Sequence, residues 1–181
     1  KSRRMFIEKI AAGTATAAGL TAITGFSTNR VAALENGSDP EAWFKKAKGR
    51  HRIVYDASEP HNGLPFIWSW VFYHTNNETA VLDNHMTAMV VLRHNALPFA
   101  LEDRLWQKYK LGEVFKVIDN TTKRPALRNP YYNPGENDFP MEAIEGIQKM
   151  QPRGAMFSVC NMALKVYSAV VAKAAGLKPE Q

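Results

Sequence analysis

The sequence has almost no cysteine, the residue that forms disulfides and many zinc and redox sites. Its 181 residues contain one cysteine, Cys160. A single cysteine excludes an internal disulfide and every paired-cysteine zinc or redox site, so stability must come from packing. The chain also lacks an HExxH sequence, a glycine-rich phosphate-binding loop and a G-x-S-x-G turn. These absences argue against zinc peptidases of that type, P-loop nucleotide-binding proteins and α/β-hydrolases.

The positive charge of the chain is concentrated at its N-terminus. The whole sequence has 23 Lys and Arg, 17 Asp and Glu, and a net charge of +6. Residues 1–33 hold five of the basic residues and one acidic residue, which leaves 18 basic and 16 acidic residues, a net charge of +2, for residues 34–181. A nearly balanced domain of this kind does not indicate a nucleic-acid partner.

The N-terminal residues form a pattern typical of an export signal. Ser2-Arg3-Arg4-Met5-Phe6-Ile7 precedes residues 10–26, a run of 17 residues without charge, and the small residues of Val31-Ala32-Ala33 follow. An arginine pair before a mildly apolar run predicts the twin-arginine route. We therefore divide the chain into a twin-arginine signal, residues 1–33, and one domain, residues 34–181, that works in the periplasm. The alternative is a surface helix with a basic end.

The sequence leaves open whether the signal is cleaved or retained. A run of 17 residues is at the short end of the roughly 17–25 that span a bilayer. Arginines on its N-terminal side would stay in the cytoplasm. If the segment is retained, residues 5–26 form a hydrophobic helix that anchors the domain to the inner membrane.

Within the domain, predicted strands alternate with predicted helices. A short helix starts at Ser38-Asp39-Pro40-Glu41, with Trp43 and Phe44 as its apolar anchors. Strands are predicted at residues 52–57, 85–94, 114–118 and 155–160, and helices at residues 64–74, 100–109, 141–150 and 161–175. This alternation predicts an α/β fold with a mostly parallel sheet and helices on both faces. The aromatic run from Trp68 to Tyr73 fits a core or a subunit interface.

Polar side chains follow three of the predicted strands. The carboxyl ends of parallel strands meet at one edge of a sheet, where ligands usually bind. We therefore group four residues as a candidate site: Glu59, His61, His94 and Cys160.

Cys160 is the candidate nucleophile of this group. It lies where a strand meets a helix, and the positive end of a helix dipole favours a thiolate. A thiolate can attack, hold a persulfide or bind a soft metal, with His94 or His61 tuning it and Glu59 orienting the imidazole. The alternatives are a small apolar core residue for Cys160 and structural hydrogen bonding for the histidines. Glu59 and His61 alone are a weak metal signal, and we predict neither a metal nor a cofactor.

Residues 119–139, from Asp119 to Phe139, form a long irregular stretch. Loops of this length inside a compact domain are usually lids, binding elements or disordered segments. Tyr and Arg are enriched at binding hot spots, so we predict that this loop contacts other protein subunits, with Tyr131 and Tyr132 foremost. The alternative is a loop folded back over the edge of its own sheet.

Several segments are similar to the DsrE/DsrF-like family. Residues 90–101 (VVLRHNALPFAL) resemble its strand, polar turn and helix start, and residues 154–165 (GAMFSVCNMALK) resemble its strand that ends in a cysteine before a helix. Residues 53–56 (IVYD) fit its first strand. The matches WSW, NNET, LEDRLW and RNP extend the resemblance over residues 39–176, to an exported subgroup with twin-arginine signals.

The resemblance implies a flavodoxin-like three-layer fold, oligomerisation and sulfur-relay chemistry on a cysteine. The chain departs from the family in lacking further cysteines toward its C-terminus and in ending soon after a helix, without one more strand. Two functions follow. The favoured one is a periplasmic, membrane-anchored accessory subunit without chemistry of its own, in a complex such as a respiratory or photosynthetic electron-transfer complex. The alternative is a periplasmic sulfur or thiol carrier with Cys160 as persulfide acceptor.

Overall fold

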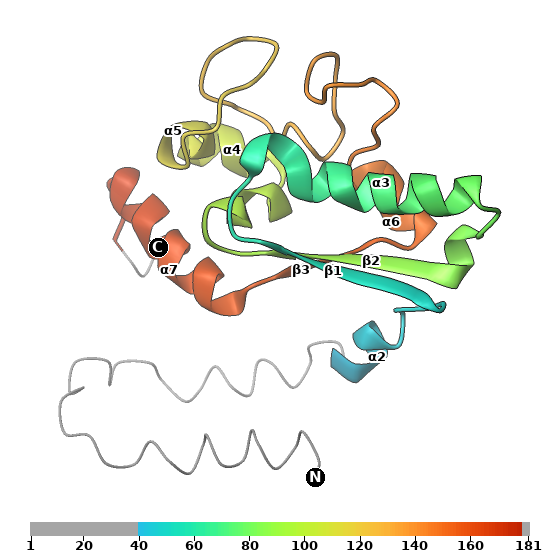
Figure 1. The fold of residues 1–181 in the computed structure, drawn as a ribbon. Helices are drawn as coiled ribbons and strands as arrows, with labels where there is room; N and C mark the ends of the chain where they lie inside the picture. Colours follow the sequence, from blue (N-terminus) through green and yellow to red (C-terminus); the bar gives the residue numbers. More distant parts are fainter. Residues whose placement is uncertain (1–39, 179–181) are drawn as a thin grey trace, which may run out of the picture. The chain divides into compact units, whose positions relative to one another are not determined.

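The computed structural model describes residues 40–178 and shows an α/β fold on a three-stranded sheet (Figure 1). Both strand pairings are parallel, and the strand order is β1-β2-β3. The strands are β1 (His51–Ala57), β2 (Met86–Leu92) and β3 (Met156–Val159). The helices are α2 (Pro40–Phe44), α3 (Leu64–Glu78), α4 (Asp103–Tyr109), α5 (Leu111–Val114), α6 (Ile147–Arg153) and α7 (Asn161–Ala174), with three 3₁₀ segments, η3 (His61–Gly63), η4 (Asp83–His85) and η5 (His94–Ala100). The predicted α/β class with a parallel sheet is confirmed.

The predicted signal and membrane anchor lie outside the described residues, as does the boundary between residues 33 and 34. Among residues 40–178, no helix combines the length and the apolar character that crossing a membrane requires.

β2 is the central strand, because its side chains are apolar on both faces. Ala88, Val90 and Leu92 on one face are at most 1% exposed. Met89 and Val91 on the other face are half-buried. Leu92 pairs with Ala57 on one side and with Val159 on the other, so the three strands end level with one another.

Both crossover connections cover the same face of the sheet. The strand order follows the chain without a reversal, and right-handed connections then place their helices on one side. Figure 1 shows α3 and α6 together on that side. The described residues place no helix over the opposite face, where Val54 of β1 is 62% exposed. The sequence predicted helices on both faces, but residues 40–178 supply them to one face only.

α3 shows why this chain segment packs on the sheet. Its buried side chains recur at helical spacing, and the helix contacts both β1 and β2. Trp70 and Tyr73 belong to this buried side, whereas Trp68 is 52% exposed. The predicted helix is confirmed, although only one side of its aromatic run enters the core.

The predicted strand at residues 114–118 is wrong. Residues up to Val114 belong to α5, and Lys116 has a positive φ of 55° that interrupts an extended backbone. Ile118 forms only an isolated antiparallel bridge with Pro125 and is 51% exposed. The sheet therefore has three strands in the described region rather than the predicted four.

Two predicted helices begin later than expected. α6 begins at Ile147 instead of residue 141, because the carbonyls of Tyr131 and Tyr132 accept from the amides of Ile147 and Gln148, at 2.9 Å each. These bonds cap the first turn of the helix. α4 begins at Asp103, after η5, instead of at residue 100.

β3 and α7 occupy the predicted positions but are more exposed than expected. Val159 at the end of β3 is 42% exposed, so β3 is an edge strand rather than a buried one. α7 is confirmed within a residue of its predicted end, and Ala163 is its one buried residue. It packs against η5 and α5 at the carboxyl end of the sheet.

Candidate functional site

The carboxyl ends of the three strands bring together several of the predicted residues. Arg93 follows β2 and binds Asp56 of β1 in a bidentate pair, with Nε to Oδ1 at 2.5 Å and Nη2 to Oδ2 at 2.7 Å. The hydrogen bond from Arg93 is the largest contribution to the lowered pKa of the Asp56 carboxyl. A long-range pair of this geometry ties the ends of two neighbouring strands together.

Cys160 lies at the same edge, at the N-cap of α7. Its amide donates to the carbonyl of Leu92 at 3.0 Å, and its Sγ accepts from the amide of Ala163 at 3.5 Å. The pKa of Arg93 is raised chiefly by its hydrogen bond to Asp56, with the charges of Asp56 and Cys160 adding to the shift. The thiol is half-buried and unpaired with any other cysteine. The Sγ of Cys160 therefore lies at the first turn of α7, within electrostatic reach of Arg93.

Glu59 does not orient an imidazole, contrary to the prediction. Both of its carboxylate oxygens accept from Asn95 Nδ2 at 3.0 Å, and Tyr167 OH of α7 donates to Asn95 Oδ1 at 3.4 Å. This chain of polar contacts joins the loop after β1 to η5 and α7. Glu59 thus connects the loop after β1 to Asn95 of η5.

The two candidate histidines are both exposed at this edge. His94 begins η5 with a positive φ of 47° and approaches Tyr167 edge-on, with ring centroids 6.5 Å apart. His61 is exposed in η3, and neither histidine has a hydrogen bond to Cys160. In the part of the chain that the structure describes, no three His, Cys, Asp or Glu side chains are grouped so that they could hold a metal ion.

A cleft of about 540 Å³ opens on the helix-covered face of the same edge. Leu92, Phe157 and Val159 line it from the sheet, and Phe99, Leu101 and Ile147 line it from the segments packed above. Pockets that bind small molecules or apolar side chains are usually of this size and apolar character. Asp56, at the end of β1, alternates with Ala57 and belongs to the opposite face, so its pair with Arg93 and the cleft lie on different sides of the sheet.

The rim of the cleft is polar and slightly acidic. Its charged residues are Glu102, Asp103 and Arg104, a net charge of −1. Arg104 Nε pairs with Glu102 Oε1 at 2.7 Å, and Asp103 Oδ1 accepts from the amide of Asn129 at 2.8 Å. Tyr132 and Gln151 complete the rim.

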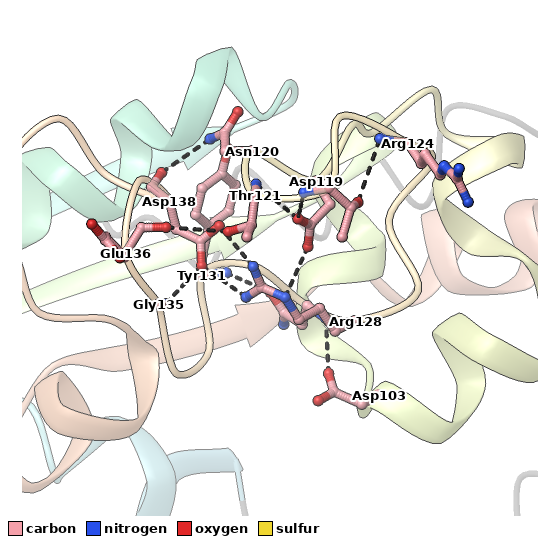
Figure 2. Close-up of polar contacts among 12 residues, drawn as sticks. Asp103, Asp119, Asn120, Thr121, Arg124, Arg128, Tyr131, Gly135, Glu136 and Asp138 are labelled. Atoms are coloured by element: carbon pink, nitrogen blue, oxygen red, sulfur yellow. Dashed lines mark hydrogen bonds and ion pairs between the residues drawn. The ribbon is translucent and has the colours of Figure 1, made fainter.

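The predicted contact loop, residues 119–139, is held by an internal ion network (Figure 2). Arg128 Nε binds Asp119 Oδ2 at 2.8 Å, and its Nη1 and Nη2 bind the two Asp138 carboxylate oxygens at 2.7 and 2.9 Å. Burial alone would raise the pKa of Asp119, but the amides of Thr122 and Thr121 and the charge of Arg128 outweigh it and lower that pKa. The loop therefore has a defined structure of its own.

Tyr131 is not available to a partner, which corrects one part of the predicted interface. It is 5% exposed and packs against Phe66, Phe99 and Phe139 at centroid distances of 5.0 to 5.3 Å. Burial raises the pKa of Tyr131 to about 12. Tyr132 is 44% exposed and faces the cleft, so its predicted role in a contact stays a prediction.

Sequence reasoning missed the arginines that organise these sites. Arg93 is next to the predicted site residue His94, and Arg128 lies within the predicted contact loop at residues 119–139. The partner of Arg93 lies 37 residues earlier in the chain. Arg128 pairs with one carboxylate before it and one after it, Asp119 and Asp138. No local sequence spacing predicts such pairs, and the only signal for the Arg93–Asp56 pair is the opposite charge of its two residues. No protein-family model, curated protein or solved structure matches this chain.

Proposed function

We propose that this chain is a periplasmic, non-catalytic accessory subunit of a membrane protein complex, for example a respiratory or photosynthetic electron-transfer complex. We propose further that residues 5–26 attach it to the inner membrane. The observation that carries the proposal is an exposed apolar stripe on α7. The stripe consists of Met162, Val166 and Val170, which are 67%, 52% and 46% exposed.

The stripe lies beside the residues through which α7 packs on the domain. Ala163 is buried, and Tyr167 and Val171 are partly buried against the core. Each exposed residue of the stripe comes one position before one of these packed residues. The apolar side of α7 is therefore wider than the part of it that the rest of the domain covers. Fully burying one such side chain is worth about 1.5–3 kcal/mol. Contiguous exposed apolar surface of this kind commonly marks a protein contact.

The polar residues of the carboxyl edge support a binding role over a catalytic one. Glu59 is occupied by Asn95, and Asp56 is occupied by Arg93. A histidine base within hydrogen-bond reach is one means of activating a nucleophile. Cys160 Sγ accepts from the amide of Ala163 in the first turn of α7, and no histidine among the described residues hydrogen-bonds to it.

The family assignment belongs to the same proposal. A DsrE-like, flavodoxin-like fold has helices on both faces of its sheet, whereas residues 40–178 cover one face. We propose that the third layer comes from outside these residues. A partner subunit that covers the open face around Val54 would supply it.

The α7 stripe is tested by Val166→Lys, with Ser168→Lys as the matched control. Both positions are exposed on the same helix, and both variants add one positive charge. We expect Val166→Lys to lose the membrane proteins that co-purify with the tagged wild type, while its melting temperature stays within about 2 °C of wild type because no core residue changes. Ser168→Lys should keep both properties. Retention of the same proteins by Val166→Lys would contradict the proposal.

The second candidate function is a thiol or sulfur carrier, which the position of Cys160 favours. A thiol at a helix N-cap beside an arginine suits a nucleophile. If it is a carrier, Cys160 should react with iodoacetamide at pH 7 about tenfold faster than free cysteine, and Arg93→Gln should slow that reaction. Arg104→Gln, which removes an exposed arginine on the cleft rim, should leave the rate unchanged. A rate no faster than that of free cysteine would eliminate this candidate.

A further inference from the structure

We propose that the outer edge of β3, together with the cleft beside it, docks an extended basic peptide segment of a partner protein. The inference rests on the proposed function as an accessory subunit and names the kind of segment that such a partner would present. It comes from three features of one surface: the free edge of a strand, the cleft, and the charge on the rim of the cleft.

The backbone of β3 has one free side. The amide of Cys160 donates to the carbonyl of Leu92, and Leu92 is in register with Val159. Backbone groups of successive strand residues point to alternate sides, so the amide and carbonyl of Phe157 and Val159 point away from β2. Within residues 40–178, no strand or loop hydrogen-bonds to that side. Such an edge can accept an additional strand.

The same two residues also form a wall of the cleft. The side chains of Phe157 and Val159 line its volume of about 540 Å³ together with Leu92 and Leu101. Every second side chain of a strand added to β3 would face that side of the sheet. A large apolar side chain of the added segment can therefore enter the cleft while its backbone pairs with β3.

The acidic rim of the cleft favours a basic residue close to that apolar side chain in the docked segment. Glu102 is neutralised by Arg104, but the Asp103 carboxylate has no cationic partner among the described residues. β3 itself, Met156-Phe157-Ser158-Val159, contains no lysine or arginine. Pairing with the β3 edge of a second copy would leave Asp103 unmatched, whereas a segment with an apolar and a basic side chain two residues apart, on the same face of the strand, would satisfy both surfaces.

The probe for this site is a fluorescein-labelled heptapeptide with phenylalanine at position four, lysine at positions two and six, which share its face of the strand, and threonine at the other four positions. We expect the full-length protein to bind it saturably by fluorescence anisotropy. Binding should slow the hydrogen exchange of the Phe157 and Val159 amides measured by NMR. A peptide with glutamate in place of lysine should bind about tenfold more weakly.

Val159→Pro tests the backbone of the site, with Val54→Pro as its matched control. Each substitution removes an outward-facing amide from an edge strand, because the Ala57 carbonyl accepts from Arg93 and the Val54 amide therefore also points away from β2. Val159→Pro should weaken peptide binding at least tenfold, and Val54→Pro should not. If Val159→Pro does not fold, Ala100→Trp, which fills the cleft from its rim without changing β3, should weaken binding to the same extent.

Absence of saturable binding, or equal binding by Val159→Pro and Val54→Pro, would overturn the inference. It would also fall if the protein sediments as a dimer whose Phe157 and Val159 amides are protected without peptide, because a second copy would then occupy the edge. The proposed function is judged separately, by the partners that wild type retains and Val166→Lys loses. Loss of those partners together with a failure of the peptide to bind would remove only the inference made here.

Discussion

Three arginines connect loops of this domain by binding carboxylates that lie between 8 and 70 residues away along the chain. Arg93 joins the ends of β1 and β2 through Asp56, and Arg128 joins both ends of the loop at residues 119–139. Arg153 at the end of α6 binds Asp83, Asn77 and Glu145 and lies over the ring of Tyr73, 5.1 Å from its centroid. The planar guanidinium suits such multiple contacts because it offers five donors in a fixed geometry.

Arg128 is the residue whose removal should cost most among the charged residues. The side chains of Asp138 and Asp119 are 0% and 5% exposed, so Arg128→Ala leaves two buried carboxylates without a cation. Loss of one partner of a buried pair typically costs about 3–5 kcal/mol. Arg124→Ala, four residues earlier and exposed, should change the free energy of unfolding by less than about 0.5 kcal/mol. Equal unfolding midpoints in urea for the two variants would show that the network is not stabilising.

The same network predicts how stability depends on pH. The folded-state pKa of Asp119 lies below its ordinary value, so the folded state binds the proton more weakly than the unfolded state. The resulting stabilisation is complete above the unfolded pKa of about 3.9 and is lost as the pH falls through the folded value. Wild type should therefore become less stable below about pH 4. The stability difference between Arg128→Ala and wild type should shrink there, as urea unfolding at pH 7 and pH 3 can measure.

At the scale of elements, the sequence was informative where apolar residues followed a clear period. The apolar centre of β2 and the long run of α3 predicted both elements to within a few residues. Prediction failed at residues 114–118 and 141–146 because backbone hydrogen bonds to residues outside those segments decide the structure there. Val117 is held by Gly112 and Ala126, and α6 is started by the carbonyls of Tyr131 and Tyr132.

Gly112 is the point at which one of these contacts can be tested. A Cβ built on Gly112 would lie 2.3 Å from the backbone nitrogen and oxygen of Ala126, so Gly112→Ala must push apart α5 and the segment that packs on it. Overpacking of this kind usually costs about 1–3 kcal/mol. Gly135→Ala is the control, since its Cβ would meet only Asp138 Oδ2, at an ordinary 3.6 Å. We expect a lower melting temperature for Gly112→Ala alone, and an unchanged one would contradict the close packing.

At the scale of the whole molecule, the sequence predicted the α/β class but could not predict which surfaces are covered. Strand order depends on pairings between segments far apart in the chain, and the order β1-β2-β3 leaves one sheet face without a described helix. The candidate site shows the same limit. The sequence predicted that Cys160, His94 and Glu59 lie at one edge of the sheet. The hydrogen-bond partners of Glu59 and the cleft beside β3 could not be predicted, because they depend on how loops pack across that edge.

The proposed attachment to the membrane gives the last prediction, which concerns the chain as a whole. Because the twin-arginine route requires its arginine pair, Arg3→Lys with Arg4→Lys should keep the protein in the cytoplasm although its charge is unchanged. If the segment were instead a surface helix that depends only on positive charge, its location would be unaffected by the two substitutions.

Wild type should stay in the membrane fraction after an alkaline wash, since 17 uncharged residues can hold it in the bilayer. The intact mass of the native protein then decides between an anchor and a cleaved signal. A mass that starts near Leu34 would contradict the anchor and leave the exposed surfaces of α7 and β3 as the remaining means of attachment to a membrane complex.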